Sequence, residues 1–140
     1  NPLVWSVNVY DEGGSGVTGV NQYADLNADP TDFCFTEMGL AANSLTGGPE
    51  THYQARMTGN GASVPGGHTS GWFQLNQFYG PTRSLGWHRF DMVFKGRRLS
   101  ETKGHYVDVY VDDRLAAKNA HINDENIQLT KIASNLKDKT

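Results

Sequence analysis

Cysteine is almost absent from this chain of 140 residues, which contains only Cys34. A single thiol cannot form an intramolecular disulfide, so the fold has to be stabilised by a hydrophobic core. We expect Cys34, which lies between Phe33 and Phe35, to be a buried and unreactive thiol. A chain of this length buries about two thirds of its unfolded surface as one domain, which is sufficient without disulfides or metals.

An excess of charge of one sign is also lacking. The 12 Lys and Arg residues and 15 Asp and Glu residues give a net charge of only -3. This balance argues against nucleic acid or an anionic membrane as a partner and favours a neutral or weakly polar ligand. No apolar run approaches the roughly 18 residues of a membrane-spanning helix, so we expect no membrane insertion.

Helical periodicity is the third absence. No segment repeats its apolar residues every 3.6 positions, and the nearest candidate, 116–126, contains Asn and Asp that favour a turn. Sixteen glycines separate short apolar segments. We predict strands over 3–10, 17–23, 33–40, 52–57, 71–75, 87–94, 106–111, 115–118 and 127–133. Short strands separated by turns predict an all-β fold, two antiparallel sheets packed as a β-sandwich.

We assign one domain to residues 1–134 and a polar C-terminal tail or linker to 135–140. Two of the predicted strands have the clearest pattern, because residues 86–94 and 106–111 alternate apolar and polar side chains. Asp112 and Asp113 follow the second run directly. Because Asp tolerates the left-handed conformation, this pair predicts a two-residue hairpin turn.

The same residues resemble a known pattern. Gly-Trp-His-x-Phe from Gly86 and Val-x-Val-Tyr-Val-Asp-Asp-x-Leu over 107–115 are similar to neighbouring strands of concanavalin A-like and laminin-G-like lectin-type β-sandwiches. The order of Tyr-x-x-Arg (Tyr53, Arg56) and the segment 81–88 extends the resemblance over roughly the last three fifths of the chain. The resemblance implies a jelly-roll fold in a secreted or cell-surface protein, and a non-catalytic recognition module that binds glycan.

Two departures accompany the resemblance. Asp113 replaces the glycine that is usual in the hairpin, and complete domains of this class tend to be longer. The first half of the chain matches only in its alternating pattern.

Aromatic residues are the candidates for a ligand-binding face, because a flat ring covers the C–H face of a sugar. Trp72 and Tyr79 flank the loop-rich middle of the chain, and with Tyr53 and Arg56 they form the predicted ligand-binding set. We expect Trp87, at the start of a strand, to pack in the core.

An acidic stretch offers a candidate calcium site. Asp25, Asn27 and Asp29 have the one-three-five spacing of oxygen ligands, and Asp32 lies close behind. Pro30 at the sixth position, where glycine is needed, rules out an EF-hand. The alternatives are a looser Ca²⁺ site and a solvated turn. We predict no required cofactor.

Catalytic patterns are sparse. No Glu-x-Asp-x-Glu or Gly-x-Ser-x-Gly occurs, and Asp91 and Asp108 lie singly on different strands. Tyr53, Arg56 and His88 imitate a lyase group only loosely. A polysaccharide lyase or glycoside hydrolase on the same fold is therefore an alternative hypothesis, as is a structural or adhesive protein-binding domain. The sequence leaves the oligomeric state open.

Overall fold

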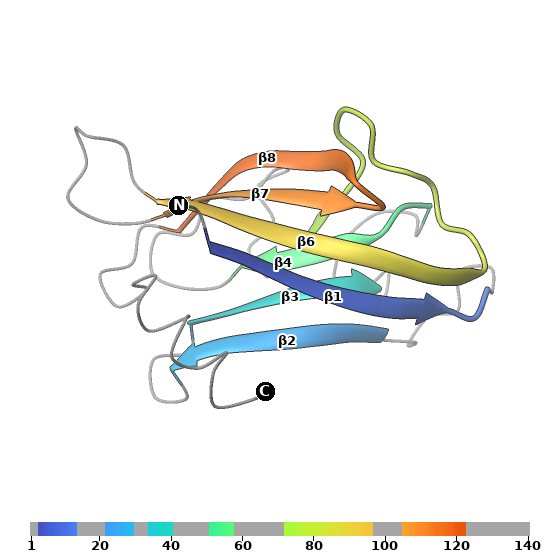
Figure 1. Cartoon of the computed structure of the whole chain (residues 1–140), viewed down its shortest axis with the longest axis horizontal. Helices are drawn as coiled ribbons and strands as arrows, with labels where there is room; N and C mark the ends of the chain where they lie inside the picture. Colours follow the sequence, from blue (N-terminus) through green and yellow to red (C-terminus); the bar gives the residue numbers. More distant parts are fainter. Residues whose placement is uncertain are drawn as a thin grey trace.

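The computed structural model describes residues 3–13, 22–29, 34–40, 51–57, 72–96 and 105–122. Throughout these ranges the secondary structure is β-strand, turn or irregular. The described residues therefore contain no helix that could cross a lipid bilayer. The strands are β1 (Leu3–Asp11), β2 (Gln22–Asp29), β3 (Cys34–Leu40), β4 (Gln54–Met57), β5 (Trp72–Gln74), β6 (Gly86–Gly96), β7 (His105–Val111) and β8 (Arg114–Ile122) (Figure 1).

The strands form two antiparallel sheets of four strands each. The first sheet has the order β1-β6-β7-β8 and the second has the order β2-β3-β4-β5. The chain therefore starts in the first sheet, forms the whole second sheet, and returns to complete the first. The prediction of an all-β structure with two antiparallel sheets is confirmed.

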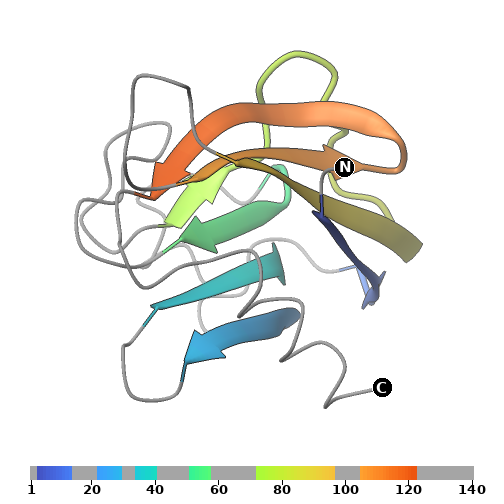
Figure 2. The same ribbon diagram turned by 60° about the vertical axis from the view of Figure 1, so that its left-hand side comes forward.

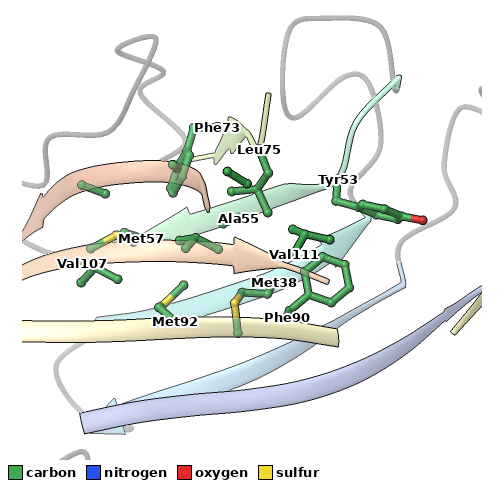
Figure 3. Packing of buried hydrophobic residues seen from close by; sticks show 14 of the residues in the cluster. Met38, Tyr53, Ala55, Met57, Phe73, Leu75, Phe90, Met92, Val107 and Val111 are labelled. Carbon is green, nitrogen blue, oxygen red and sulfur yellow. The ribbon is translucent and has the colours of Figure 1, made fainter. Parts of the chain in front are cut away.

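Both sheets contribute to one hydrophobic core (Figure 3). Alternation along β6 directs Phe90, Met92 and Phe94 inward, where they are fully buried. The second sheet supplies Met38 and Met57 among others, and Figure 3 shows these side chains between the strands of the two sheets. The alternation of apolar and polar residues in the sequence therefore separates the side chains that face the core from those that face the surface.

The turn between β7 and β8 has the predicted form (Figure 2). Asp112 and Asp113 have φ angles of 49° and 63°, and Val111 pairs directly with Arg114 on either side of them. Positive φ at both central residues defines a type I′ turn, whose twist matches that of the flanking strands.

Two strand predictions need correction. Strand β8 continues to Ile122, so the turn expected from position 116 is wrong in its described part. Ala116, Ala117 and Ala120 are buried in the core, and this burial outweighs the low strand propensity of the neighbouring residues. Strand β2 includes the described end of the predicted strand 17–23 and continues to Asp29, beyond the end expected at 23. The predicted strand 127–133, the tail 135–140 and the start of the predicted strand 17–23 lie outside the described residues.

The segment between β5 and β6 covers the outer edge of β8. The amide of Gln77 donates to the carbonyl of Ala116, and that of Tyr79 donates to the carbonyl of Leu115, each at 3.0 Å. Gly80 N–H donates to Gln77 C=O at 3.0 Å and closes a turn. These backbone hydrogen bonds place residues 76–85 across the end of the first sheet where β6 begins (Figure 1).

Candidate functional site

A pair of exposed aromatic rings lies where β1 ends and β6 begins. Trp87 is 70% exposed and Tyr10 is 42% exposed, and the two residues are direct partners in the β1–β6 register. Their ring centroids are 5.3 Å apart with an interplanar angle of 71°, an edge-to-face contact. The core role that we expected for Trp87 is wrong, because its neighbour His88 belongs to the inward-facing positions of β6.

The next row on the same outer face is polar. Asn8 and Arg89 are register partners, and both side chains are exposed. Arg89 Nε donates to Asp91 Oδ1 at 3.0 Å, and the Ser6 hydroxyl donates to the same carboxylate oxygen. These contacts fix the guanidinium beside the rings. We call Tyr10, Trp87, Asn8 and Arg89 together the aromatic–polar patch.

Further apolar side chains are exposed at this end of the sheet. Leu85, Phe78 and Tyr79 all belong to the segment between β5 and β6, and Tyr79 is 74% exposed. Phe78 has a φ of 51°, a conformation that a bulky residue rarely adopts. The turn that contains it is held by the backbone hydrogen bonds to β8. The ligand-facing role expected for Tyr79 stays a prediction.

Behind the aromatic–polar patch, the buried Asp11 forms an ion pair with the partly buried Arg83. Arg83 Nη2 lies 3.1 Å from Asp11 Oδ1, and Arg83 Nε lies 3.3 Å from Oδ2. The amide of Gly13 and the hydroxyl of Tyr53 also donate to the carboxylate, at 2.9 and 3.0 Å. Burial by itself raises the pKa of Asp11, but these donors and the charge of Arg83 outweigh it and hold the pKa below 3.8.

Tyr53 has a structural role in this junction. Tyr53 is 1% exposed and its ring lies at the edge of the hydrophobic core. Its hydroxyl group points away from the core (Figure 3). That hydroxyl donates to Asp11 and accepts the amide N–H of Ser84 at 3.2 Å. Burial raises the pKa of Tyr53 well above its ordinary value, and the hydrogen bond to Asp11 adds to the effect. The ligand-facing role that we expected for Tyr53 does not fit these contacts.

His88 joins three segments of the chain. Its Nδ1 lies 2.6 Å from Asp112 Oδ2 in the β7–β8 hairpin, and its Nε2 lies 2.6 Å from the Ser84 carbonyl oxygen. Because both partners accept, both ring nitrogens have to carry a proton. Burial lowers the pKa of His88, but the hydrogen bonds to Asp112 and Ser84 and the charges of Asp112 and Asp11 outweigh it, so that the pKa is raised.

The order Ser84, His88, Asp112 is superficially that of a catalytic triad, with Ser84 Oγ 3.2 Å from His88 Nε2. A general base has to present a neutral imidazole lone pair to the hydroxyl. Here the same Nε2 is closer to a carbonyl oxygen and faces it as a donor. The geometry therefore favours a protonated histidine that holds the hairpin and the Ser84 segment together.

The His88 contacts predict a dependence of stability on pH. A pKa raised in the folded state stabilises the protein fully below the unfolded value of about 6.5, and this stabilisation is lost as pH rises through the folded pKa. Urea unfolding from pH 5.5 upward is expected to show falling stability for the wild type. His88→Gln is expected to lose about 1–3 kcal/mol at pH 5.5 and to have a flatter profile. Parallel profiles for the two proteins would contradict this role.

Trp72 and Arg56 are brought together in the second sheet. They are register partners, and the Arg56 guanidinium carbon lies 5.7 Å from the centroid of the Trp72 ring. Arg56 Nη1 also lies 3.7 Å from Glu37 Oε1. Trp72 is 1% exposed and offers no open ring face, so the ligand-facing role expected for it does not fit its burial. Tyr53 directly precedes β4 and lies in the core with Ala55 and Met57, whereas Arg56 has the opposite parity on β4 and points to the other face.

Asp91 and Asp108, which the sequence showed only singly, lie close in the register of β6 and β7. Asp91 pairs with Tyr110, and Asp108 pairs with Val93 two positions further along. Both carboxylates are nearly buried, and Lys95 Nζ lies 2.9 Å from Asp108 Oδ1 while Arg89 holds Asp91. These ion pairs give both carboxylates a stabilising role on the outer face of the first sheet.

Part of the candidate calcium site is extended backbone. Asp25, Asn27 and Asp29 lie on β2, with a register irregularity between Asn27 and Asp29, whereas Asp32 lies outside the described residues. The solvated turn that we weighed as the alternative is not the conformation of 25–29. Among the side chains that the structure describes, no three His, Cys, Asp or Glu residues form a group that could hold a metal ion. Calcium binding by the acidic stretch stays a prediction.

No family model, curated protein or solved structure matches this chain.

A signal for the exposure of Trp87 was present in the sequence. The even positions of 87–95 are His, Phe, Met and Phe, whereas the odd positions include Arg, Asp and Lys. Trp87 shares the parity of the charged residues, and that parity assigns it to the solvent-facing side.

Proposed function

We propose that this protein is a non-catalytic recognition module that binds glycan through the aromatic–polar patch. The observation that carries the proposal is the exposed Trp87 ring, held by Tyr10 in an edge-to-face contact. Large apolar side chains exposed side by side on a packed domain commonly mark a binding surface. A sugar ring fits it, because its C–H face covers the indole while its hydroxyls reach polar neighbours.

Asn8 and Arg89 supply those polar neighbours. Adjacent strands are about 4.8 Å apart and alternate residues along a strand are about 6.6 Å apart, so the four side chains of the patch cover an area comparable to one sugar ring. The amide of Asn8 both donates and accepts, and Arg89 only donates. Exposed rings beside hydrogen-bonding side chains are the combination that sugar binding requires.

The resemblance to concanavalin A-like and laminin-G-like domains supports the same proposal. Two four-stranded antiparallel sheets around one core are compatible with a jelly-roll β-sandwich, and we extend the proposal to that fold and to a secreted or cell-surface location. The fold class alone hosts many functions, so the patch is the stronger support.

The test is replacement of Trp87 by alanine. Because loss of a central stacking ring costs about 2 kcal/mol or more, Trp87→Ala is expected to weaken binding to a recognised polysaccharide about thirtyfold. Affinity gel electrophoresis against immobilised polysaccharides, followed by calorimetry, measures this. Val4→Ala, at an exposed position on the same face of β1, is the matched control and is expected to bind like the wild type.

Tyr79→Ala separates two ligand faces. Loss of binding in this variant would indicate that the binding site includes the segment between β5 and β6. Unchanged binding would indicate a site formed by β1 and β6 alone. Binding that survives Trp87→Ala in a folded protein would refute the proposed site.

A protein-binding domain is the second candidate, and the exposed Leu85, Phe78 and Trp87 favour it. The two candidates differ in one measurable respect. A glycan module binds purified polysaccharide directly, whereas an adhesive domain requires a protein surface and leaves every polysaccharide unbound.

A further inference from the structure

Arg89 is held by its Nε atom, and the hydrogen bonds among the described residues do not engage its two terminal amino groups. The side chain is 55% exposed, and within the described residues its hydrogen bond is that of Nε to Asp91 Oδ1. Ser6 donates to the same Asp91 oxygen and helps to fix the carboxylate. A planar guanidinium fixed in this way presents two adjacent donors in one plane.

The charge of Arg89 is already balanced. Asp91 is 6% exposed and lies against the guanidinium, so an arriving carboxylate or sulfate would share the cation with a fixed anion. Hydroxyl groups do not meet this repulsion, because they accept from the guanidinium without adding charge. The pair therefore discriminates against anionic ligands.

The charged groups around the patch also disfavour anionic ligands. Asp11 is paired with Arg83, and Asp112 with His88. Among the described residues, the remaining exposed charged groups at this end of the sheet are Glu12 and Asp113, which are acidic, and Arg114, which is basic. The described surroundings of the patch are thus neutral to slightly negative, which does not attract polyanions.

We propose that Arg89, fixed by Asp91, is the specificity-determining residue of the patch and selects uncharged sugars that present two adjacent hydroxyl groups beside the ring stacked on Trp87. This inference rests on the proposed glycan-binding function and specifies its ligand class. The guanidinium donates to both hydroxyl oxygens, and the Asn8 amide is available to a third polar group of the same sugar.

The experiment compares polysaccharides that share a backbone and differ in charge. Hydroxyethylcellulose is paired with carboxymethylcellulose, and methyl-esterified homogalacturonan with its de-esterified form, beside neutral xylan, mannan and galactan. At least one neutral polymer is expected to bind with a Kd that changes less than about twofold between about 50 and 500 mM NaCl. An acidic counterpart of a bound polymer is expected to bind at least about tenfold more weakly.

Variants test the role of the guanidinium itself. Arg89→Lys keeps the charge and loses the planar pair of donors, so it is expected to weaken binding about tenfold or more. Lys118→Gln, at an exposed position on β8, removes a charge two strands away from β6 and is expected to bind like the wild type.

The outcomes separate the inference from the function on which it rests. Preference for the acidic member of a pair, or full binding by Arg89→Lys, overturns the inference, and if that binding is lost in Trp87→Ala the proposed function stands. Absence of any binding that depends on Trp87 overturns both.

Discussion

Replacing Arg83 with alanine is expected to destabilise the protein by about 3–5 kcal/mol. The substitution leaves the Asp11 carboxylate, which is 1% exposed, without the cation that balances its charge. Tyr53 and Gly13 still donate hydrogen bonds to it, but two neutral donors do not replace a guanidinium that contacts both carboxylate oxygens. A loss of this size is a large part of the total stability of a domain of this length.

Urea unfolding at pH 7 measures the effect, and Arg114→Ala is the control for loss of a positive charge. Arg114 is exposed in the β7–β8 hairpin, and its replacement is expected to change stability by less than about 0.5 kcal/mol. Equal effects of the two substitutions would show that the Asp11–Arg83 pair contributes no more than a surface charge.

The Asp11–Arg83 pair also affects how the stability of the protein changes at acidic pH. Because the pKa of Asp11 is lowered in the folded state, its contribution is complete above about pH 4 and is lost as pH falls through the folded pKa. In Arg83→Ala the main cause of the lowered pKa is removed. Acid unfolding of that variant is therefore expected to begin at a higher pH than in the wild type.

Replacing Gly80 with alanine is the second substitution expected to have a large effect, about 3 kcal/mol or more. A Cβ atom at Gly80 would lie 2.1 Å from the Leu75 carbonyl oxygen and 3.1 Å from the Ala116 Cβ. The first of these is a backbone atom, and Leu75 is fixed by its own hydrogen bond to Tyr53. The turn that carries Phe78 and Tyr79 has to move to remove the overlap.

Gly13→Ala is the matched control. Gly13 has a φ of 69°, but among the described residues a Cβ atom there would meet the Leu85 side chain alone, at 3.4 Å. Its cost is the strain of a left-handed alanine, about 1–2 kcal/mol. Thermal unfolding of both variants compares the two. A Gly80→Ala protein as stable as Gly13→Ala would mean that the segment between β5 and β6 adapts without loss.

Several features of the fold followed from local pattern. Alternation over 87–94 and 106–111 predicted β6 and β7, and Asp112-Asp113 predicted the turn that joins β7 to β8. These predictions succeeded because side-chain alternation along a strand and the conformation of a two-residue turn are visible in neighbouring residues.

Placement of individual side chains was less predictable. Trp72 was expected to meet a ligand and is buried, and Trp87 was expected to be buried and is exposed. Both are aromatic residues at strand starts, so their own residue types did not distinguish them. The parity of Trp87 with Arg89 and Asp91 was visible in the sequence, whereas the burial of Trp72 beside Arg56 depends on strand pairing in the second sheet.

The sequence by itself determined that this chain forms alternating strands and one tight hairpin, because both depend on the two-residue period of the backbone and on conformations open to Asp. Only the tertiary structure decided which residues meet at the end of the first sheet where β6 begins. Arg83 contacts Asp11, which lies 72 positions earlier in the sequence, and Trp87 lies beside Tyr10 because β1 pairs with β6. Such contacts are set by strand order and register, which local pattern does not encode.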